Sequence, residues 1–180
     1  FAELLDAVGE ICDGAGRRVW VHYTSPHPRD MTEEVYQVQA KHPSLAKYLN
    51  LPMQSGDSEV LKRMNRRYSI ETYMEKLDMA RRIMPEITVS TDIIVGFCGE
   101  TEEEFNYLLD FMREAKIDRA GCFAYSPVEG AKANELAGAL PDELRNERQA
   151  RFMEVAEEIS TQLLQAKVGK RIKVLVDSVS

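Results

Sequence analysis

Four apolar runs in the sequence each end in a polar or glycine-rich stretch, and these stretches contain the residues best suited to chemistry. They are HYTSPHP (22–28), LPMQSGD (51–57), IVGFCGE (94–100) and YSPVEG (125–130). In a parallel sheet or barrel, the carboxyl ends of the strands meet at one rim, where such proteins commonly bind their ligands. The four stretches therefore predict one binding site built from loops that are distant in sequence.

The third stretch places a glycine turn directly before acidic residues. Gly96 and Gly99 are followed by Glu100 and by Glu102–Glu104, at the expected start of a helix. This charge disfavours a phosphate site, and no Lys-Ser or Lys-Thr pair follows the glycines as in a P-loop. A ligand with an amino group or ribose hydroxyls suits the turn better. The simpler alternative is that the glycines only make a tight turn, with the glutamates on a solvent-exposed face beside the positive end of the helix dipole.

The other polar residues at the predicted rim could also have purely structural roles. Gln54 and Ser55 precede a helix and could cap it. His22 and His27 could be ordinary loop or core histidines. Neither histidine has a partner at metal-ligand spacing, so no metal site is expected in this chain.

The three cysteines are too few and too widely spaced for a disulfide framework or a zinc site. Cys12 and Cys122 are expected to be small buried hydrophobic residues. Cys98 lies inside the glycine loop, and its role is left open. Unpaired cysteines are typical of a reducing compartment, so a cytoplasmic protein is expected.

The composition favours a water-soluble globular domain, because 44% of the 180 residues are hydrophobic and 29% are charged. The net charge of -7 argues against a large, non-specific nucleic-acid surface, which needs clustered Lys and Arg. No apolar run approaches the roughly 20 residues that cross a bilayer, so no membrane partner is expected. The chain opens at Phe1 inside a predicted helix, which suggests a piece of a longer protein.

Strands and helices alternate along the chain, which predicts an α/β fold with parallel strands and right-handed crossovers. The strands beginning near Val19, Lys47, Ile87 and Arg119 are expected to be parallel neighbours in that order. Four such units are too few to close an eight-stranded barrel, so a partial barrel or an open sheet is predicted. Helices are predicted over 1–15, 32–42, 57–66, 69–84, 101–116 and 141–169, and strands over 17–25, 45–52, 87–97, 118–126 and 170–180.

Three long motifs resemble the radical S-adenosylmethionine methylthiotransferases. They are LPMQSGDSEVLKRMNRRYS, STDIIVGFCGETEEEF and GCFAYSPVEGAKANEL. The resemblance implies a partial TIM-type (β/α)6 barrel that is incomplete in this chain. Residues 1–168 would be the C-terminal part of that barrel, and residues 169–180 the truncated start of a C-terminal β-domain.

The resemblance also implies a cofactor site for S-adenosylmethionine at the rim. This chain differs from the family pattern, because the family holds its catalytic 4Fe–4S cluster with a CxxxCxxC motif that this sequence lacks. The cluster ligands are therefore expected outside this chain, which alone should be inactive, and Cys98 stands where the family usually has proline. No catalytic residue is assigned. The cofactor-side residues implied are Gln54, Ser55, Arg66, Asp92, Gly96 and Gly99, with Ser90 as an alternative to Asp92, and the substrate-side residues are His22, Ser126 and Glu129.

Two branches of the family compete for the substrate. The third motif and the tail QLLQAKVGKRIKVLVD are similar to the branch that adds a methylthio group to an aspartate of a small-subunit ribosomal protein. LPMQSG and STDIIVGF lean towards the branch that modifies an adenosine in tRNA. The ribosomal-protein branch is favoured, and a monomer is expected. The non-enzymatic alternative is a barrel fragment that only binds a nucleotide or a partner. A TIM-barrel fragment that uses carboxylates for acid–base chemistry is a further alternative, but no pair of acids at two strand ends supports it.

Overall fold

The computed structural model describes residues 1–172 and is built around a three-stranded parallel sheet. The strands are β1 (Tyr48–Asn50), β2 (Thr88–Val95) and β3 (Arg119–Ala124), and they lie side by side in that order. This confirms the predicted α/β class with parallel strands in an unclosed sheet. The α-helices are α1 (Ala2–Asp13), α2 (Glu33–Lys41), α3 (Ser58–Arg63), α4 (Ile70–Ile83), α5 (Glu102–Ala115) and α6 (Asp142–Gln165), with 3-10 turns at Pro28–Asp30 and Lys132–Glu135.

The prediction of a fourth strand near Val19 is wrong. Val21 forms only an isolated parallel bridge to Leu45, where the Val21 N–H donates to the Ser44 carbonyl at 2.8 Å. The extended backbone stops at Ser25, whose φ of 53° is in the left-handed region. Pro26 follows and has no N–H for a ladder. The segment therefore lies in the predicted order beside β1 without forming a strand. The predicted strand over 170–180 falls outside the described residues except for 170–172, which are not in a strand.

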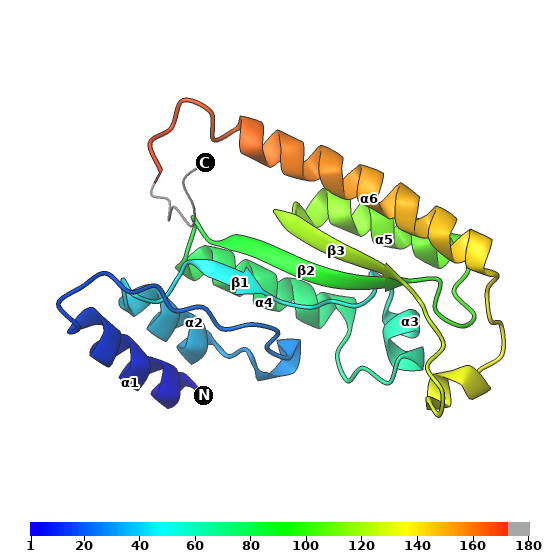
Figure 1. The fold of residues 1–180 in the computed structure, drawn as a ribbon, viewed down its shortest axis with the longest axis horizontal. Helices are drawn as coiled ribbons and strands as arrows, with labels where there is room; N and C mark the ends of the chain where they lie inside the picture. The colour runs from blue at the N-terminus through cyan, green and yellow to red at the C-terminus, as the bar shows by residue number, and fades with distance from the viewer. Residues whose placement is uncertain (173–180) are drawn as a thin grey trace.

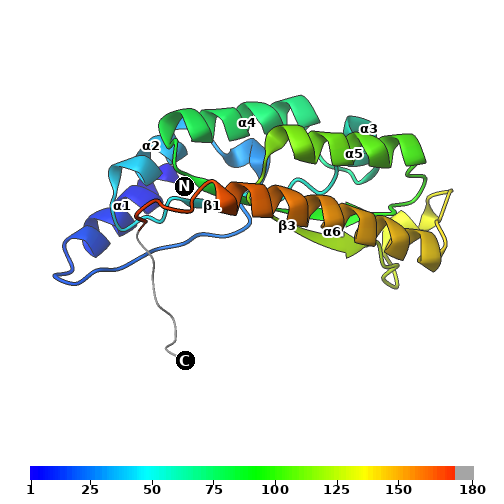
Figure 2. The ribbon, with the colours of Figure 1, turned by 90° about the horizontal axis from the view of Figure 1, so that it is seen from above.

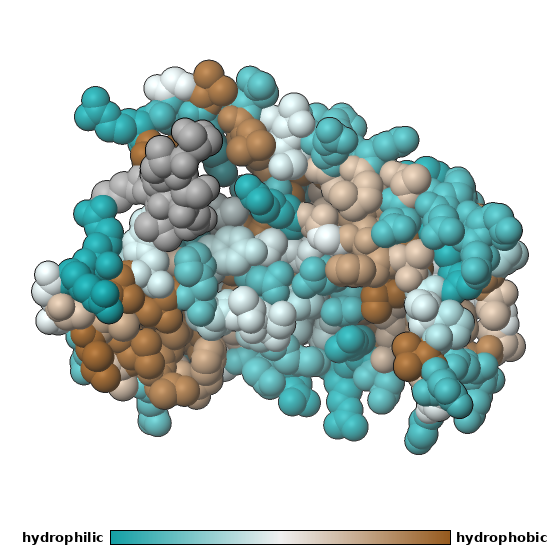
Figure 3. Space-filling model, in the orientation of Figure 1, coloured by the Kyte–Doolittle hydropathy of each residue, from teal (hydrophilic) through white to brown (hydrophobic). Residues whose placement is uncertain are grey.

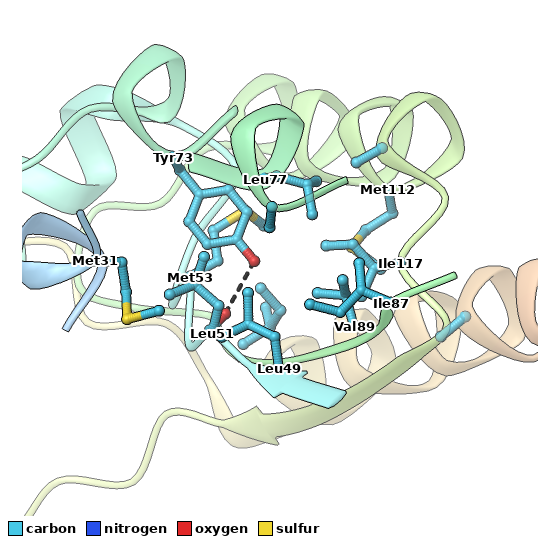
Figure 4. Packing of buried hydrophobic residues seen from close by; sticks show 14 of the residues in the cluster. Met31, Leu49, Leu51, Met53, Tyr73, Leu77, Ile87, Val89, Met112 and Ile117 are labelled. Atoms are coloured by element: carbon cyan, nitrogen blue, oxygen red, sulfur yellow. Dashed lines mark hydrogen bonds between the residues drawn. The ribbon is translucent and has the colours of Figure 1, made fainter. Parts of the chain in front are cut away.

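The helices cover one face of the sheet and leave the other face without a helix in the described part of the chain. Figures 1 and 2 show α4 and α5 along one face, with α6 beside β3. Side chains alternate along β2, so Val89, Ile93 and Val95 are buried towards the helices. Tyr73 of α4 reaches into this core, where its hydroxyl donates to the Leu51 carbonyl at 2.9 Å (Figure 4). The apolar run over 87–97 predicts a strand covered on both faces, but residues 1–172 place helices on only one face.

Helix α6 protects the free edge of the sheet. Gln149 donates its amide N–H to the Cys122 carbonyl of β3 at 2.7 Å, and Arg145 donates to the Tyr125 carbonyl just beyond the strand. At the other end of α6, the Lys167 ammonium lies 3.4 Å from Asp118, which precedes β3. The helix ends at Gln165, before the predicted stop at Gly169. These contacts attach α6 to Cys122 within β3 and to the residues that flank the strand.

Helix α1 presents apolar side chains to solvent. Leu5 is buried, but Leu4 and Ile11, which are predicted to lie on the same apolar face, are 64% and 74% exposed. Phe1 is exposed as well, and the space-filling view shows a hydrophobic patch over α1 (Figure 3). Among residues 1–172, no helix combines the length and apolar character needed to cross a membrane.

A histidine between two carboxylates attaches α1 to the end of α2. The His42 side chain is 5% exposed, with Nε2 lying 2.6 Å from Asp6 and Nδ1 lying 2.7 Å from Asp13. Both ring nitrogens must donate to serve two carboxylates, so the imidazolium form is favoured. Hydrogen bonds to Asp6 and then to Asp13 raise the pKa of His42 above its usual value of 6.5. The pKa of Asp13 is lowered, mainly by His42, and that of Asp6 is lowered by Lys41 and His42.

This arrangement predicts a stability that depends on pH. The pKa of His42 is raised in the folded state. Its contribution to the stability of the fold is therefore fully present below the unfolded-state pKa, and it is lost as the pH rises through the folded-state pKa. The two aspartates, whose pKa values are lowered, lose their contribution only as pH falls below the usual carboxyl range. We therefore expect the denaturant concentration at the midpoint of unfolding to decrease as the pH is raised from about 5.5 to about 9. The fall should be much smaller in His42→Gln, and an identical fall in both proteins would contradict this role for His42.

Candidate functional site

The uncovered face of the sheet carries a row of linked polar side chains. Because side chains alternate along a strand, Tyr48 and Asn50 of β1 point to the same face as Ser90 and Asp92 of β2. The Tyr48 hydroxyl lies 2.6 Å from Ser90 Oγ, and Asn50 Nδ2 lies 3.0 Å from the same oxygen. Asn50 Nδ2 also contacts Asp92 Oδ2 at 3.4 Å. The row fixes these side chains and leaves the Asp92 carboxylate with spare acceptor capacity.

Three further residues border this polar row. Ser25 donates from its backbone N–H and its hydroxyl to Asn50 Oδ1, both at 3.1 Å. The His22 ring lies edge-on to Tyr48, with 5.8 Å between ring centroids. Gly121 of β3 lies opposite Asp92, and a Cβ there would be 3.0 Å from Asp92 Oδ1. A strand glycine of this kind often marks a place where another group approaches closely.

At the end of β1, Gln54 turns the chain towards α3. Its φ is 75°, and it still pairs with β2, since its N–H donates to the Asp92 carbonyl at 2.9 Å. The neighbouring Ser55 is buried, and its hydroxyl accepts the Asp57 N–H at 3.3 Å. Asp57, rather than Ser55, is the N-cap of α3. The expectation that Ser55 caps this helix is therefore wrong, because its hydroxyl is used one step earlier, in the turn that leads to the N-cap.

Arg66 lies in the turn after α3, where its N–H donates to the Leu61 carbonyl at 2.8 Å, and nearby Tyr68 packs against the rim. The Tyr68 hydroxyl donates to the Met53 carbonyl at 2.9 Å, and its ring packs edge-on against His27. Arg66 itself is half-buried. The two substrate-side residues predicted after β3, Ser126 and Glu129, are exposed on the loop that follows the strand. No contact links either of them to the polar row.

Both glycines of the loop at the end of β2 are explained by the backbone conformation, and Gly96 also by a close contact within the chain. Gly96 and Gly99 have φ values of 72° and 74°, which suit glycine. A Cβ on Gly96 would lie 2.4 Å from Arg145 Cγ, so α6 approaches the loop closely there. The Gly99 N–H donates to the Gly138 carbonyl at 2.7 Å, so a second loop lies over the first. Their lack of side chains is thus explained without a ligand, and only their backbone is available for one.

Glu100 is not on a solvent-exposed face, and that interpretation of the sequence is wrong for this residue. Its side chain is 2% exposed and accepts Arg148 Nη1 at 2.7 Å and the Gly96 N–H at 3.0 Å. Burial raises the pKa of the Glu100 carboxyl, against the opposing effect of these two donors. The burial of Glu100 could not be predicted from the local sequence, because its partner, Arg148, lies 48 residues away.

The remaining glutamates of the acidic block fit the prediction better. Thr101 and Glu104 form a capping box at the start of α5, in which each side chain accepts the other residue's N–H. Glu104 also accepts both Nη atoms of Arg63, at 2.9 and 2.8 Å, and this hydrogen bonding lowers its pKa. Glu102 and Glu103 are exposed in the first turn. Arg63 therefore joins the α3 end of the rim to the acidic block.

The three cysteines do not form a site together. Cys98 is 3% exposed beneath the loop after β3, where its Sγ donates to the Ala133 carbonyl at 3.4 Å. Cys122 is buried as predicted, and burial raises its pKa to about 12, whereas Cys12 is only half-buried. Residues 1–172 contain no group of three or more His, Cys, Asp or Glu side chains that could hold a metal ion.

Two cavities lie near these elements. A small one, of about 120 Å³, separates the loop of Cys98 from the loop after β3, and it also borders Tyr125, Asn134 and Arg145. A larger one, of about 470 Å³, lies beside α1 and the segment before β1. Neither of these two cavities is lined by residues of the polar row.

A three-stranded parallel sheet with helices on one face and polar side chains on the other is the architecture of a partial α/β barrel. Residues 1–112 match the family model of the Radical SAM superfamily. The chain belongs to this superfamily.

The more particular similarity is to one group of enzymes within it. Over 99% of its length, the chain is 52% identical to the ribosomal protein uS12 methylthiotransferase RimO of Burkholderia ambifaria. It is also 52% identical, over the same share, to the RimO of Ralstonia nicotianae. The chain spans about 40% of the length of these relatives. The family resemblance seen in the three motifs is confirmed.

Solved structures of low sequence identity support the fold alone. Coproporphyrinogen III oxidase (HemN) from Escherichia coli, a radical SAM enzyme, aligns with a TM-score of 0.65 at 19% identity, over 90% of this chain and 37% of that one. Methylornithine synthase (PylB) aligns with a TM-score of 0.58 at 19% identity, over 87% of this chain and 43% of that one. In both cases this chain aligns with only part of a longer protein.

The contact between the two rim loops generates a prediction. A Cβ on Gly138, whose φ is 83°, would lie 2.9 Å from Gly99 Cα, so Gly138→Ala should separate the loops and expose Cys98. Overpacking of this kind costs about 1–3 kcal/mol. We expect alkylation of Cys98 by iodoacetamide, followed by peptide mass spectrometry, to become at least about tenfold faster.

The matched control is Gly130→Ala. Gly130 has a similar φ of 78° but has no atom within 4 Å of the added Cβ, so it carries the backbone strain without the clash. Its alkylation rate at Cys98 should stay near that of the unchanged protein. Equal acceleration in both variants would show that strain, not contact with Gly99, determines access to the thiol.

Proposed function

We propose that this chain is the C-terminal part of the radical domain of a methylthiotransferase that modifies an aspartate of ribosomal protein uS12. The observation that carries the proposal is the 52% identity to RimO over 99% of the chain, which leaves no segment of the described fold unmatched by these enzymes. The proposed location is the cytoplasm, and the proposed partner is the small-subunit ribosomal protein, bound by a monomer.

The residues at the rim fit S-adenosylmethionine as the cofactor. Asp92 has free acceptor capacity beside the rim, which suits an amino group or ribose hydroxyls. Arg66 is a half-buried cation that suits a carboxylate. When bound, the cofactor supplies the means to abstract a hydrogen atom from an unactivated C–H bond. The proposed cofactor side comprises Gln54, Ser55, Arg66, Asp92, Gly96 and Gly99, and the proposed substrate side comprises His22, Ser126 and Glu129.

The 4Fe–4S clusters of such enzymes do not fit the residues of this chain. Three thiolates are needed in one place, whereas Cys98 and Cys122 are buried in separate environments and Cys12 lies on α1. The ligands are therefore proposed to lie in the part of the intact protein that this chain does not include. Within the chain, the proposed contribution is binding and orientation. Gln54 and the loop of Gly96 and Gly99 shape the rim, and the polar row fixes Asp92.

The intact protein that contains this chain provides the direct test. After anaerobic reconstitution, and with S-adenosylmethionine, sulfide and a one-electron reductant added, we expect it to replace one hydrogen of an aspartate in purified uS12 with a methylthio group, as measured by peptide mass spectrometry. The same preparation should leave tRNA adenosines unchanged. A uS12 in which that aspartate is replaced by asparagine is the matched control. Modification of tRNA instead of uS12 would assign the chain to the other branch, and modification of neither would favour the binding-only alternative.

Arg66 offers a sharper test of the cofactor side. If its guanidinium binds the cofactor carboxylate, Arg66→Met should weaken S-adenosylmethionine binding about tenfold, or about 1.4 kcal/mol. Arg67→Met is the control, because Arg67 has the same charge on the adjacent, exposed position. Equilibrium binding and iron content would be measured for both in the intact protein. Equal weakening by both variants would show that Arg66 acts only through its positive charge and not through a specific contact with the cofactor.

A further inference from the structure

The only arginine in residues 1–172 with almost no exposed side chain lies on α6 and reaches the loop at the end of β2. Arg148 is 3% exposed and its partner Glu100 is 2% exposed. Arg148 Nη1 donates to Glu100 Oε1 at 2.7 Å and to the Glu100 backbone carbonyl at 3.0 Å. One nitrogen therefore contacts the loop through both a side chain and the main chain.

Glu100 transmits this contact to the first glycine of the loop. The oxygen that accepts Arg148 also accepts the Gly96 N–H at 3.0 Å. The Glu100 N–H donates to the Phe97 carbonyl at 2.9 Å, which closes the turn. The Glu100 carboxylate thus holds the Gly96 end of loop 96–100, and the position of that carboxylate is held by α6.

The pair is poorly explained as a device for stability. Burying two charges costs several kcal/mol in desolvation, about as much as their attraction returns, and well-packed apolar residues are often as stable or more so. Arg148 Nε is also buried with no hydrogen-bond partner, which adds to the cost. What the pair provides, and an apolar pair would not, is a donor aimed at the carboxylate that orients Gly96.

We propose that Arg148 is a positioning residue, which sets the conformation of loop 96–100 by holding the Glu100 carboxylate against the Gly96 N–H. Through this loop, α6 determines the shape of one side of the rim. The consequence for S-adenosylmethionine rests on the proposed function, whereas the effect on the loop does not.

A neighbouring arginine gives a matched control. Arg151 lies one turn further along α6, and both guanidinium groups stack on the Phe105 ring, at 5.4 Å for Arg148 and 4.8 Å for Arg151. Both also contact the Glu102 carboxylate, but only Arg148 contacts Glu100. Arg151→Met therefore removes the same kinds of α5–α6 contact without touching the loop.

The test is hydrogen exchange of the peptide that covers residues 95–101, in the intact protein. With its guanidinium removed in Arg148→Met, the loop should exchange at least about tenfold faster, as expected when a hydrogen bond of about 1.4 kcal/mol is lost. Arg151→Met should leave this peptide near the unchanged rate. Equal acceleration in both variants, or none in Arg148→Met, would overturn the proposal.

A second variant separates positioning from loss of packing. In the double variant Arg148→Met with Glu100→Gln, a neutral amide oxygen can accept the Gly96 N–H without a guanidinium beside it, so slow exchange should return. If exchange stays fast, Arg148 acts through α6 packing and not through Glu100. Should Arg148→Met fail to fold, Arg148→Lys, which keeps the charge but loses the fork, should show a smaller acceleration confined to the same peptide. Acceleration throughout the protein would overturn the proposal.

Cofactor binding adds a readout that depends on the proposed function. Arg148→Met should weaken S-adenosylmethionine binding about tenfold, the double variant should recover it, and the iron content should stay constant. If the unchanged protein binds no S-adenosylmethionine, the proposed function fails, and hydrogen exchange alone still decides the role of Arg148.

Discussion

The two-residue repeat of strand β2 is the constraint on which the rest of the structure depends. Val89, Ile93 and Val95 fill the core beneath the helices, and this fixes the register of the strand, since a slip of one residue would exchange its two faces. The same register places Ser90 and Asp92 on the open face. The apolar core and the polar row are therefore two results of one pattern, and neither can shift without the other.

The rim beyond β2 is fixed by contacts from distant parts of the chain. Arg145 and Arg148 of α6, Arg63 of α3 and Gly138 of the loop after β3 all contact the segment from Gly96 to Glu104. A loop held from three sides is better suited to binding a ligand in one geometry than a free loop, because less conformational entropy is lost on binding. The acidic block, which in sequence resembles a solvated helix start, contributes half of these contacts through Glu100 and Glu104.

The sequence predicts the fold class, the helices and the parallel order well, because each rests on local periodicity and on caps such as that of Thr101 and Glu104. It wrongly predicts a strand near Val21, where the structure has only an isolated bridge to Leu45. Among the polar residues, Ser90 and Asp92 could be placed on one face from their spacing. Tyr48, Asn50 and Gly121 could not be singled out, because their roles depend on the residue-by-residue register between neighbouring strands. The pairing of Glu100 with Arg148 could not be predicted either, because no local sequence pattern connects a loop residue with a helix residue 48 positions away.

The order of the strands in the sheet is also their order in the chain, and this bears on how the protein folds during synthesis. When β2 leaves the ribosome, β1 is already present to pair with it, and β3 then adds to the edge of β2. Helix α6, which follows next, then contacts β3 through Gln149. Within the described sheet no strand must insert between two others, so the edge of β1 and then the edge of β2 are each paired by the next strand to emerge.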